Sequence, residues 1–112
     1  MRNKTTIKLI KKEVEKMKRK IVQRYRPEKI IVFGSFAWGK FTEDSDIDFL
    51  IVKNTKKRKL DRIYQVYRLL GGRKIPIDIL VYSPKEINER LKLKDFFIED
   101  VIQRGKIIYE RK

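Results

Sequence analysis

Three aspartates are the residues whose types and spacing point most directly to chemistry. Asp46 and Asp48 stand two positions apart at the start of an apolar segment that ends at Val52. Because side chains two positions apart in a strand point to the same face, the two carboxylates are expected side by side. Neighbouring carboxylates repel unless a cation joins them, and oxygen ligands with open positions suit Mg²⁺. The spacing therefore predicts a magnesium site at Asp46 and Asp48.

Asp78 is a third candidate ligand, because it interrupts the apolar segment IDIL at residues 77–80. A charge within such a strand is rare unless it is paired or bound to a metal. An ion pair with one of the many Lys and Arg residues is the alternative interpretation. If the strand of Asp78 lies beside the strand of Asp48, the three carboxylates form one cluster.

Gly34-Ser35 is a candidate phosphate-binding turn. It follows the apolar run at residues 30–33, and a short helix could start at Ser35. Glycine lets a phosphate approach the backbone, and the free N–H groups of a first helical turn can hold it. Two Mg²⁺ ions and a triphosphate are the apparatus of an in-line displacement at phosphorus. In such a site the carboxylates hold the metals, and a remaining carboxylate takes the proton of the attacking hydroxyl.

The elements that must position these residues follow from apolar periodicity. Spacings of three and four predict an amphipathic helix from Ile7 to Tyr25, ended by Pro27. Strands are predicted at 30–33, 46–52, 75–82 and 106–109, and further helices at 60–70, after a Ser83 cap and after an Asp95 cap. Tyr25 and three further residues at helical spacing are expected in the core: Met17, Tyr64 and Tyr67. The pattern predicts one α+β domain over residues 1–112, with a mixed sheet of about four strands flanked by helices.

The composition excludes several classes of chemistry. The 112 residues contain no Cys and no His, which removes disulfides, Cys/His zinc sites, thiol nucleophiles and His-dependent triads. No apolar run approaches the ~18 residues of a membrane span, and no signal peptide follows Met1, so we expect a cytoplasmic protein without membrane contact. Charged residues make up 40% of the chain, which is typical of proteins from heat-loving organisms.

The net charge of +15 indicates nucleic acid as a secondary partner. Residues 1–29 carry 12 Lys and Arg against 3 Asp and Glu, and residues 53–76 carry 9 against Asp61 alone. The basic helix at 8–26, or the basic cluster from Lys53 to Arg62 near the proposed site, would contact such a ligand. The alternative interpretation is that both basic segments are solvated surface, adapted to high temperature. Residues 30–52, in contrast, carry a net negative charge, which argues against nucleic-acid binding as the main function of the chain.

The order and spacing of these motifs resemble a known family. Gly34-Ser35, then Asp46 eleven residues after Ser35, then Asp48, then a third Asp on a later strand is similar to the DNA polymerase beta-type nucleotidyltransferase superfamily. The GS-x-A-x-G and SDID segments and the leading basic helix resemble most closely the minimal nucleotidyltransferases. That group includes the antitoxin partners of HEPN-domain toxins.

The resemblance implies transfer of AMP from ATP, with pyrophosphate leaving and two Mg²⁺ ions as cofactors. Gly34 and Ser35 would hold the triphosphate. Asp46 and Asp48 would bind both ions, and Asp78 would bind the catalytic ion and help to deprotonate the acceptor. In the toxin–antitoxin group the acceptor is a tyrosine hydroxyl of the HEPN partner, whose RNase activity the modification silences.

One departure from the family pattern affects the expected activity. Relatives usually carry Arg where this chain has Trp38, and Lys40 is the candidate replacement for that cation near the phosphates. Trp38 itself is equally well interpreted as a stacking surface or as core. Three alternatives follow: an inactive module that neutralises its partner by occlusion, transfer to a small molecule or RNA, and a basic nucleic-acid-binding domain. The sequence leaves the formation of homo-oligomers open.

Overall fold

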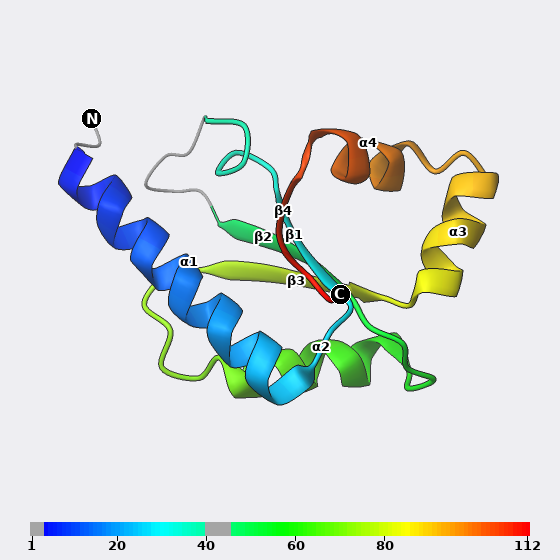
Figure 1. Ribbon diagram of the computed structural model, residues 1–112, viewed down its shortest axis with the longest axis horizontal. Helices are drawn as coiled ribbons and strands as arrows, with labels where there is room; N and C mark the ends of the chain where they lie inside the picture. The colour runs from blue at the N-terminus through cyan, green and yellow to red at the C-terminus, as the bar shows by residue number, and fades with distance from the viewer. Residues whose placement is uncertain (1–3, 40–45) are drawn as a thin grey trace.

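The computed structural model describes residues 4–39 and 46–112 as a four-stranded sheet with four helices (Figure 1). In chain order the elements are α1 (Lys4–Tyr25), β1 (Lys29–Phe33), β2 (Ile47–Val52), α2 (Lys59–Leu69), β3 (Ile77–Tyr82), α3 (Pro84–Lys92), α4 (Phe96–Arg104) and β4 (Lys106–Glu110). Helices α1 and α2 lie on one side of the sheet, and α3 and α4 lie on the other.

The sheet is mixed, as the sequence predicts. Its strand order is β3-β2-β1-β4; β1 is antiparallel to both neighbours, whereas β2 and β3 are parallel. Parallel neighbours need a crossover connection, and helix α2 provides it between β2 and β3. The α+β class is therefore confirmed, and the strands that carry Asp48 and Asp78, whose adjacency the sequence left open, are neighbours.

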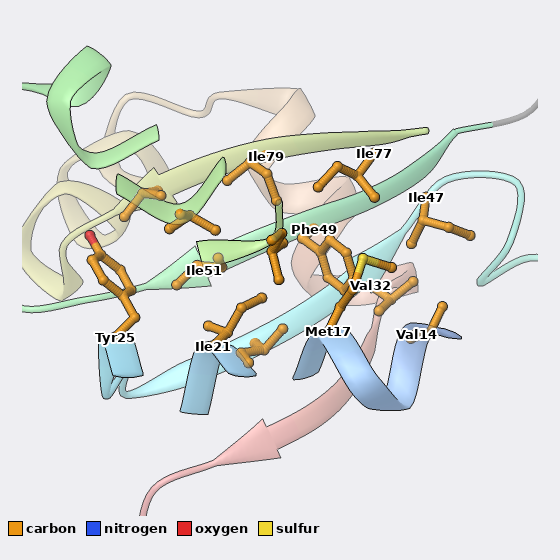
Figure 2. Close-up of a cluster of buried hydrophobic side chains, with 14 of the residues drawn as sticks. Val14, Met17, Ile21, Tyr25, Val32, Ile47, Phe49, Ile51, Ile77 and Ile79 are labelled. Atoms are coloured by element: carbon orange, nitrogen blue, oxygen red, sulfur yellow. The ribbon is translucent and has the colours of Figure 1, made fainter. Parts of the chain in front are cut away.

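The main core lies between the sheet and helix α1 (Figure 2). Strand β2 contributes every second residue to it, and α1 contributes a stripe at spacings of three and four that includes Met17 and Tyr25. Both are buried, as predicted. Tyr67 is half-buried. The prediction for Tyr64 is wrong: its side chain is 61% exposed, because α2 turns the face that carries Val66 and Leu70 toward the sheet instead.

A second, smaller cluster lies on the opposite face of the sheet. Ile31, Phe33 and Leu50 pack there against Val101 of α4. The rings of Phe33 and Phe97 meet edge to face, with centroids 5.7 Å apart. Helix α4 is therefore held on this face of the sheet by its own apolar cluster.

The predicted helix caps are present. The Ser83 hydroxyl accepts a hydrogen bond from Glu86 N at 3.2 Å, and the Glu86 carboxylate accepts one from Ser83 N at 2.7 Å, which completes a capping box. The Asp95 carboxylate accepts hydrogen bonds from Phe97 N and Ile98 N at 3.0 and 3.2 Å. Sequence signals were sufficient here because each cap depends only on residues three positions apart.

Two predicted elements differ in the structure. Strand β3 begins at Ile77 rather than at residue 75, because Pro76 has no N–H for the ladder; its carbonyl instead accepts from Ile47 N at 3.0 Å. Residues 35–39 form a turn and not a helix. Trp38 N donates to the Gly34 carbonyl at 3.1 Å, and Gly39, with φ of +78°, lies in the left-handed region.

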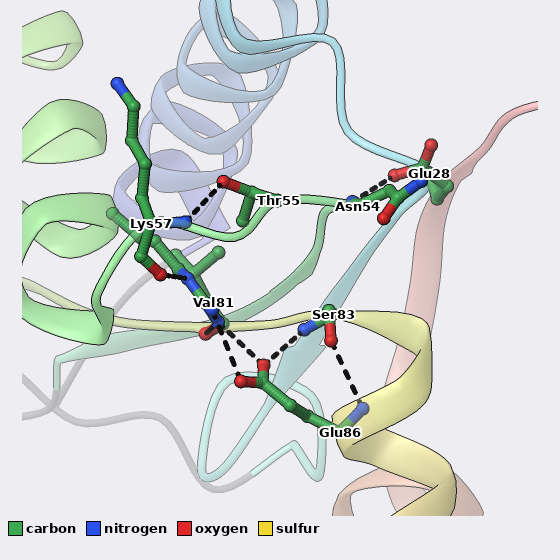
Figure 3. Close-up of polar contacts among 8 residues, drawn as sticks. Glu28, Asn54, Thr55, Lys57, Val81, Ser83 and Glu86 are labelled. Atoms are coloured by element: carbon green, nitrogen blue, oxygen red, sulfur yellow. Dashed lines mark hydrogen bonds and ion pairs between the residues drawn. The ribbon is translucent and has the colours of Figure 1, made fainter.

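Helix α2 is joined to the start of α3 by a buried ion pair (Figure 3). The sequence grouped Arg62 with a basic loop, but its side chain is only 5% exposed and donates to both Glu86 oxygens, at 2.6 and 3.2 Å. Its Nε also donates to the Lys57 carbonyl at 2.6 Å. The hydrogen bond from Arg62 lowers the pKa of Glu86 to about 2, although burial opposes the shift.

Among the described residues, no helix combines the length and the apolar character that crossing a membrane requires.

Candidate active site

The acidic residues are brought together by strand register. In the parallel pair, Asp48 of β2 stands opposite Asp78 of β3, and in the antiparallel pair Asp48 stands opposite Phe33 of β1. Cross-strand neighbours on one face have Cβ atoms about 5 Å apart. Phe33, Asp48 and Asp78 therefore form one row across three strands, which we call the acidic row.

The acidic row lies on the α3/α4 face of the sheet. Its members alternate along their strands with residues of the main core, such as Phe49 and Ile79, which face α1. Phe33 belongs to the cluster that packs on α4. Asp48 is half-buried, whereas Asp78 and Asp46 are exposed. The expectation of a buried charge at Asp78 is thus wrong, since this part of β3 is open to solvent.

Asp48 has the most perturbed carboxylate among the candidate ligands. Burial, and after it the charges of Asp78 and Asp46, together raise its pKa from 3.8 to about 6. All three causes disfavour the ionised form. A cation bound at Asp48 would offset these unfavourable effects and stabilise the ionised carboxylate.

Gly34 lies directly against this carboxylate. Its φ is +79°, and a Cβ added at this position would meet Asp48 Oδ2 within overlap distance. The sequence predicts a glycine here because a phosphate must approach the backbone. The close approach of the Asp48 carboxylate is a second reason why position 34 requires glycine. The turn after β1 therefore lies against the Asp48 carboxylate at Gly34, and Ser35, the next residue of the turn, is half-buried.

The donor set suits a hard divalent cation. Asp48 and Asp78 are strand neighbours, and Asp46 precedes Asp48 by two residues. Within residues 4–39 and 46–112, however, no group of three or more acidic residues could hold a metal by itself, so the expected three-carboxylate cluster is not preassembled. Mg²⁺ usually takes one or two carboxylates and completes its shell with water and substrate phosphates, which an open site of this kind allows.

Two contacts near the site were not predicted. Trp38 Nε1 donates to the Arg104 carbonyl at 3.2 Å, and the Arg104 guanidinium lies 3.9 Å from the centre of the Trp38 ring. Trp38 thus joins the turn after β1 to the end of α4 and brings a cation to that turn. The pairing joins positions 66 residues apart, and no local sequence signal could have revealed it. The candidate phosphate ligand Lys40 lies outside the described residues.

A second cation, Arg73, lies at the same end of the sheet but packs on Tyr67 of α2, on the opposite face from the acidic row. The Arg73 guanidinium lies 5.3 Å from the centre of the Tyr67 ring, whose hydroxyl donates to the Ile77 carbonyl at 3.1 Å, next to Asp78. Burial raises the pKa of the Tyr67 hydroxyl, the Asp78 charge raises it further, and Arg73 lowers it. The loop before β3 therefore places a positive charge at the acidic end of the sheet.

The basic cluster from Lys53 to Arg62 is not near the site, contrary to the expectation. It follows the last residue of β2, whereas Asp46 precedes the first one. A six-residue strand separates these ends by about 17 Å. Nucleotide attraction to the acidic row therefore cannot be assigned to that cluster.

Comparison with known proteins places this geometry in a family. The sequence profile described as "Nucleotidyltransferase domain" matches residues 14–109, a range that includes Gly34, Asp48 and Asp78. The chain belongs to the nucleotidyltransferase domain family. The motifs by which the sequence resembles this family lie in the turn after β1 and at the carboxylates of β2 and β3.

Two relatives of this nucleotidyltransferase come from Methanocaldococcus jannaschii. "Putative protein adenylyltransferase MJ0604" is 35% identical over 103 residues, which cover 91% of this chain and 96% of that protein. "Putative protein adenylyltransferase MJ1305" is 35% identical over 88 residues, or 73% of this chain, and the match spans 58% of that protein's length. Among solved structures, a putative nucleotidyltransferase from Sulfolobus solfataricus superposes with a TM-score of 0.57 and 28% identity, over 94% of this chain and 80% of that one.

Replacing Gly34 by alanine should damage the site more than the fold. The new Cβ would overlap Asp48 Oδ2, and alanine disfavours a φ of +79°. We expect a loss of about 1–3 kcal/mol in the free energy of unfolding and a larger loss of Mg²⁺-dependent nucleotide binding. Urea unfolding and calorimetric titration measure the two effects. Gly72→Ala is the matched control, since it shares the positive φ but meets no neighbouring atom; equal losses of binding would contradict the role given to Gly34.

The raised pKa of Asp48 predicts opposite pH trends for stability and metal binding. Between about pH 4 and 6 the native carboxyl keeps a proton that the unfolded chain has lost, so raising the pH through this range lowers the free energy of unfolding of the metal-free protein. Solvent screening limits the effect to the order of 1 kcal/mol. Mg²⁺ binding needs the ionised form and should strengthen over the same range. Urea unfolding at fixed pH values, with and without Mg²⁺, checks both; parallel trends would contradict the assignment.

Proposed function

We propose that this chain transfers a nucleoside monophosphate, AMP from ATP, to a hydroxyl group of a partner protein. The observation that carries the proposal is the acidic row, in which Asp48 and Asp78 are strand neighbours and Gly34 lies against Asp48. The family membership supports nucleotidyl transfer, and the names of the two M. jannaschii relatives support a protein as the acceptor.

In the proposed reaction the acceptor hydroxyl oxygen bonds to the α-phosphorus of ATP while the bond from that phosphorus to the pyrophosphate oxygen breaks. Asp46 and Asp48 would hold two Mg²⁺ ions, and Asp78 would hold one of them. When bound, the ions supply positive charge that offsets the phosphate charge in the transition state. Asp78, exposed at the edge of the row, takes the proton of the hydroxyl. Backbone N–H groups of the turn at Gly34-Ser35 would bind the leaving phosphates.

The surface beside the acidic row is suited to a protein acceptor. Phe97, which contacts Phe33 of the row, is 49% exposed, and its neighbours Phe96 and Leu93 are 81% and 73% exposed. Exposed aromatic and apolar residues that are grouped in this way are typical of protein-binding surfaces. We infer that the acceptor docks on the α3–α4 junction and presents its hydroxyl to Asp78. A HEPN-domain toxin is the partner we propose, with this chain as its antitoxin.

A direct test is to incubate the protein with a candidate HEPN-domain partner, ATP and Mg²⁺, and to measure the masses of both chains by mass spectrometry. We expect the partner alone to gain the mass of one or more AMP groups, and only in the presence of Mg²⁺. Phe96→Ser should reduce the rate through the acceptor's KM, whereas Leu60→Ser, at another exposed apolar position on the opposite side of the sheet, should not. If no acceptor gains mass while Mg·ATP binds, the proposed acceptor is wrong.

Neutralisation by occlusion alone is the second candidate, and Trp38 is the observation that favours it. The family resemblance leads us to expect Arg at this position, and the Trp38 ring that stands there instead is stacked with Arg104. An Asp46→Asn variant separates the two functions in cells that express the toxin. Loss of protection supports catalysis, whereas full protection supports occlusion.

A further inference from the structure

A basic hollow lies at the end of the sheet opposite to the acidic row. It has a volume of about 260 Å³ and lies between the end of α1, the loop after β2 and helix α2. Its lining contains three cations, two neutral polar side chains and one tyrosine: Arg24, Lys53, Lys57, Thr55, Gln65 and Tyr25. The lining contains no carboxylate, so its chemistry suits an oxyanion.

The cations of the hollow are not neutralised by neighbouring acids. None of Arg24, Lys53 and Lys57 takes part in an ion pair with a described residue. Asp61 is the only acidic residue between positions 53 and 76, and it pairs with Arg58. Arg24 and Lys57 are exposed and are free of ion pairs with described residues, so their charges are available to an anion that enters the hollow.

The wall of the hollow is held in place by backbone contacts. Lys53 Nζ donates to the carbonyls of Tyr25 and Arg26, at 2.6 and 3.3 Å, and so ties the loop to the end of α1. Lys57 N donates to Thr55 Oγ1 at 3.2 Å, and the Lys57 carbonyl accepts from the buried Arg62. In Figure 3 the Lys57 side chain extends away from these contacts. A loop fixed in this way presents its charges without further ordering.

Tyr25, which contributes to the wall of the hollow, has an unusual hydroxyl group. Its side chain is 5% exposed, and its hydroxyl is buried without a hydrogen-bond partner among the described residues. Burial raises the pKa of this hydroxyl, although Arg62 lowers it, so it keeps its proton as a donor. Buried polar groups without a partner are rare, and a bound water or ion is one of the explanations for them.

We propose that this hollow is a phosphate site through which the chain binds the backbone of a nucleic acid. Further cations continue from it in both directions. Exposed Lys16 and Lys20 precede Arg24 at four-residue spacing on α1, which places them about 6 Å apart along the helix axis. Lys56 and Arg58 are exposed on the loop. A ligand with phosphates in series matches this arrangement better than a single phosphate ion.

The test is fluorescence anisotropy with a labelled 12-nucleotide single-stranded RNA at several NaCl concentrations. The charge-reversed pair Arg24→Glu/Lys57→Glu removes the hollow's outer cations. The matched control, Lys85→Glu/Lys92→Glu, makes the same change in net charge at exposed positions of α3. We expect the first pair to weaken binding at least tenfold and to reduce the salt slope by about 1.4, whereas the control weakens binding less than threefold. Circular dichroism verifies the fold, and Arg24→Gln/Lys57→Gln repeats the test with a milder change.

Two outcomes would overturn the proposal. Equal weakening by both charge-reversed pairs would mean that only diffuse attraction exists, and no binding at low salt would mean that the chain does not bind RNA. If inorganic phosphate binds in a way that depends on Arg24 and Lys57 while RNA affinity does not, the hollow serves free phosphate and the nucleic-acid assignment is wrong. Asp46→Asn/Asp48→Asn should not weaken RNA binding, which separates this proposal from the nucleotidyl-transfer proposal.

Discussion

Asp48→Asn is expected to stabilise the metal-free protein and to abolish its function. Above pH 6 the ionised Asp48 carboxylate is disfavoured by burial and by its acidic neighbours, so a neutral amide of the same shape removes a penalty. The thermal midpoint should therefore rise. Mg²⁺-dependent ATP binding and AMP transfer should fall at least about a hundredfold, because the amide cannot supply the anionic oxygen that a magnesium ion needs. Differential scanning calorimetry and calorimetric titration measure the two effects.

The opposite signs of these two effects make the prediction specific. Asp61→Asn is the matched control: it removes an exposed carboxylate that pairs only with Arg58 on the surface. It should change the stability by less than about 0.5 kcal/mol and leave nucleotide binding intact. A destabilised Asp48→Asn protein that binds Mg·ATP normally would show that Asp48 is a structural residue.

Breaking the buried ion pair should have the largest effect on stability. Glu86→Ala leaves the Arg62 guanidinium, only 5% exposed, without its carboxylate and also removes the capping-box bond to Ser83 N. We expect the free energy of unfolding to fall by about 3–5 kcal/mol. Urea unfolding checks this, with Glu89→Ala as the control, because Glu89 is exposed one turn later on α3. Similar losses in the two variants would contradict the account.

The same pair predicts the acid limit of the fold. Since the native pKa of Glu86 is lowered to about 2, its contribution to stability is complete above pH 4.5 and is lost as the pH falls from there toward 2. In the Arg62→Met/Glu86→Ala double variant this loss should disappear, and much of the stability should return, because no buried charge is left unpaired. A double variant less stable than Glu86→Ala would show that Arg62 stabilises the fold by contacts other than its charge.

The sequence was sufficient for the parts of the fold that depend on local pattern. The two-residue spacing predicted that Asp46 and Asp48 share a face, and local sequence signals predicted the caps at Ser83 and Asp95. The pairing of Asp48 with Asp78 was conditional on strand order, which periodicity does not determine. Tyr64 was misassigned because the apolar side of α2 is too broad to show which edge faces the sheet.

The features that the sequence could not supply depend on contacts between distant positions. The sequence gives no sign that Arg62 is buried, because its partner Glu86 lies 24 residues later in the chain. Trp38 and Arg104 meet across 66 residues. The closeness of Gly34 to Asp48 required the register of β1 on β2. In each case a long-range pairing, and not the identity of the residue, decides the environment.

The most direct test of the central claim is calorimetric titration of ATP into the protein, with Mg²⁺ and then with EDTA, repeated on Asp46→Asn/Asp48→Asn. The account predicts binding that requires Mg²⁺ and that the double variant loses while remaining folded. ATP binding that is equally strong in EDTA, or that survives in the double variant, would contradict the assignment of the acidic row as the nucleotidyl-transfer site.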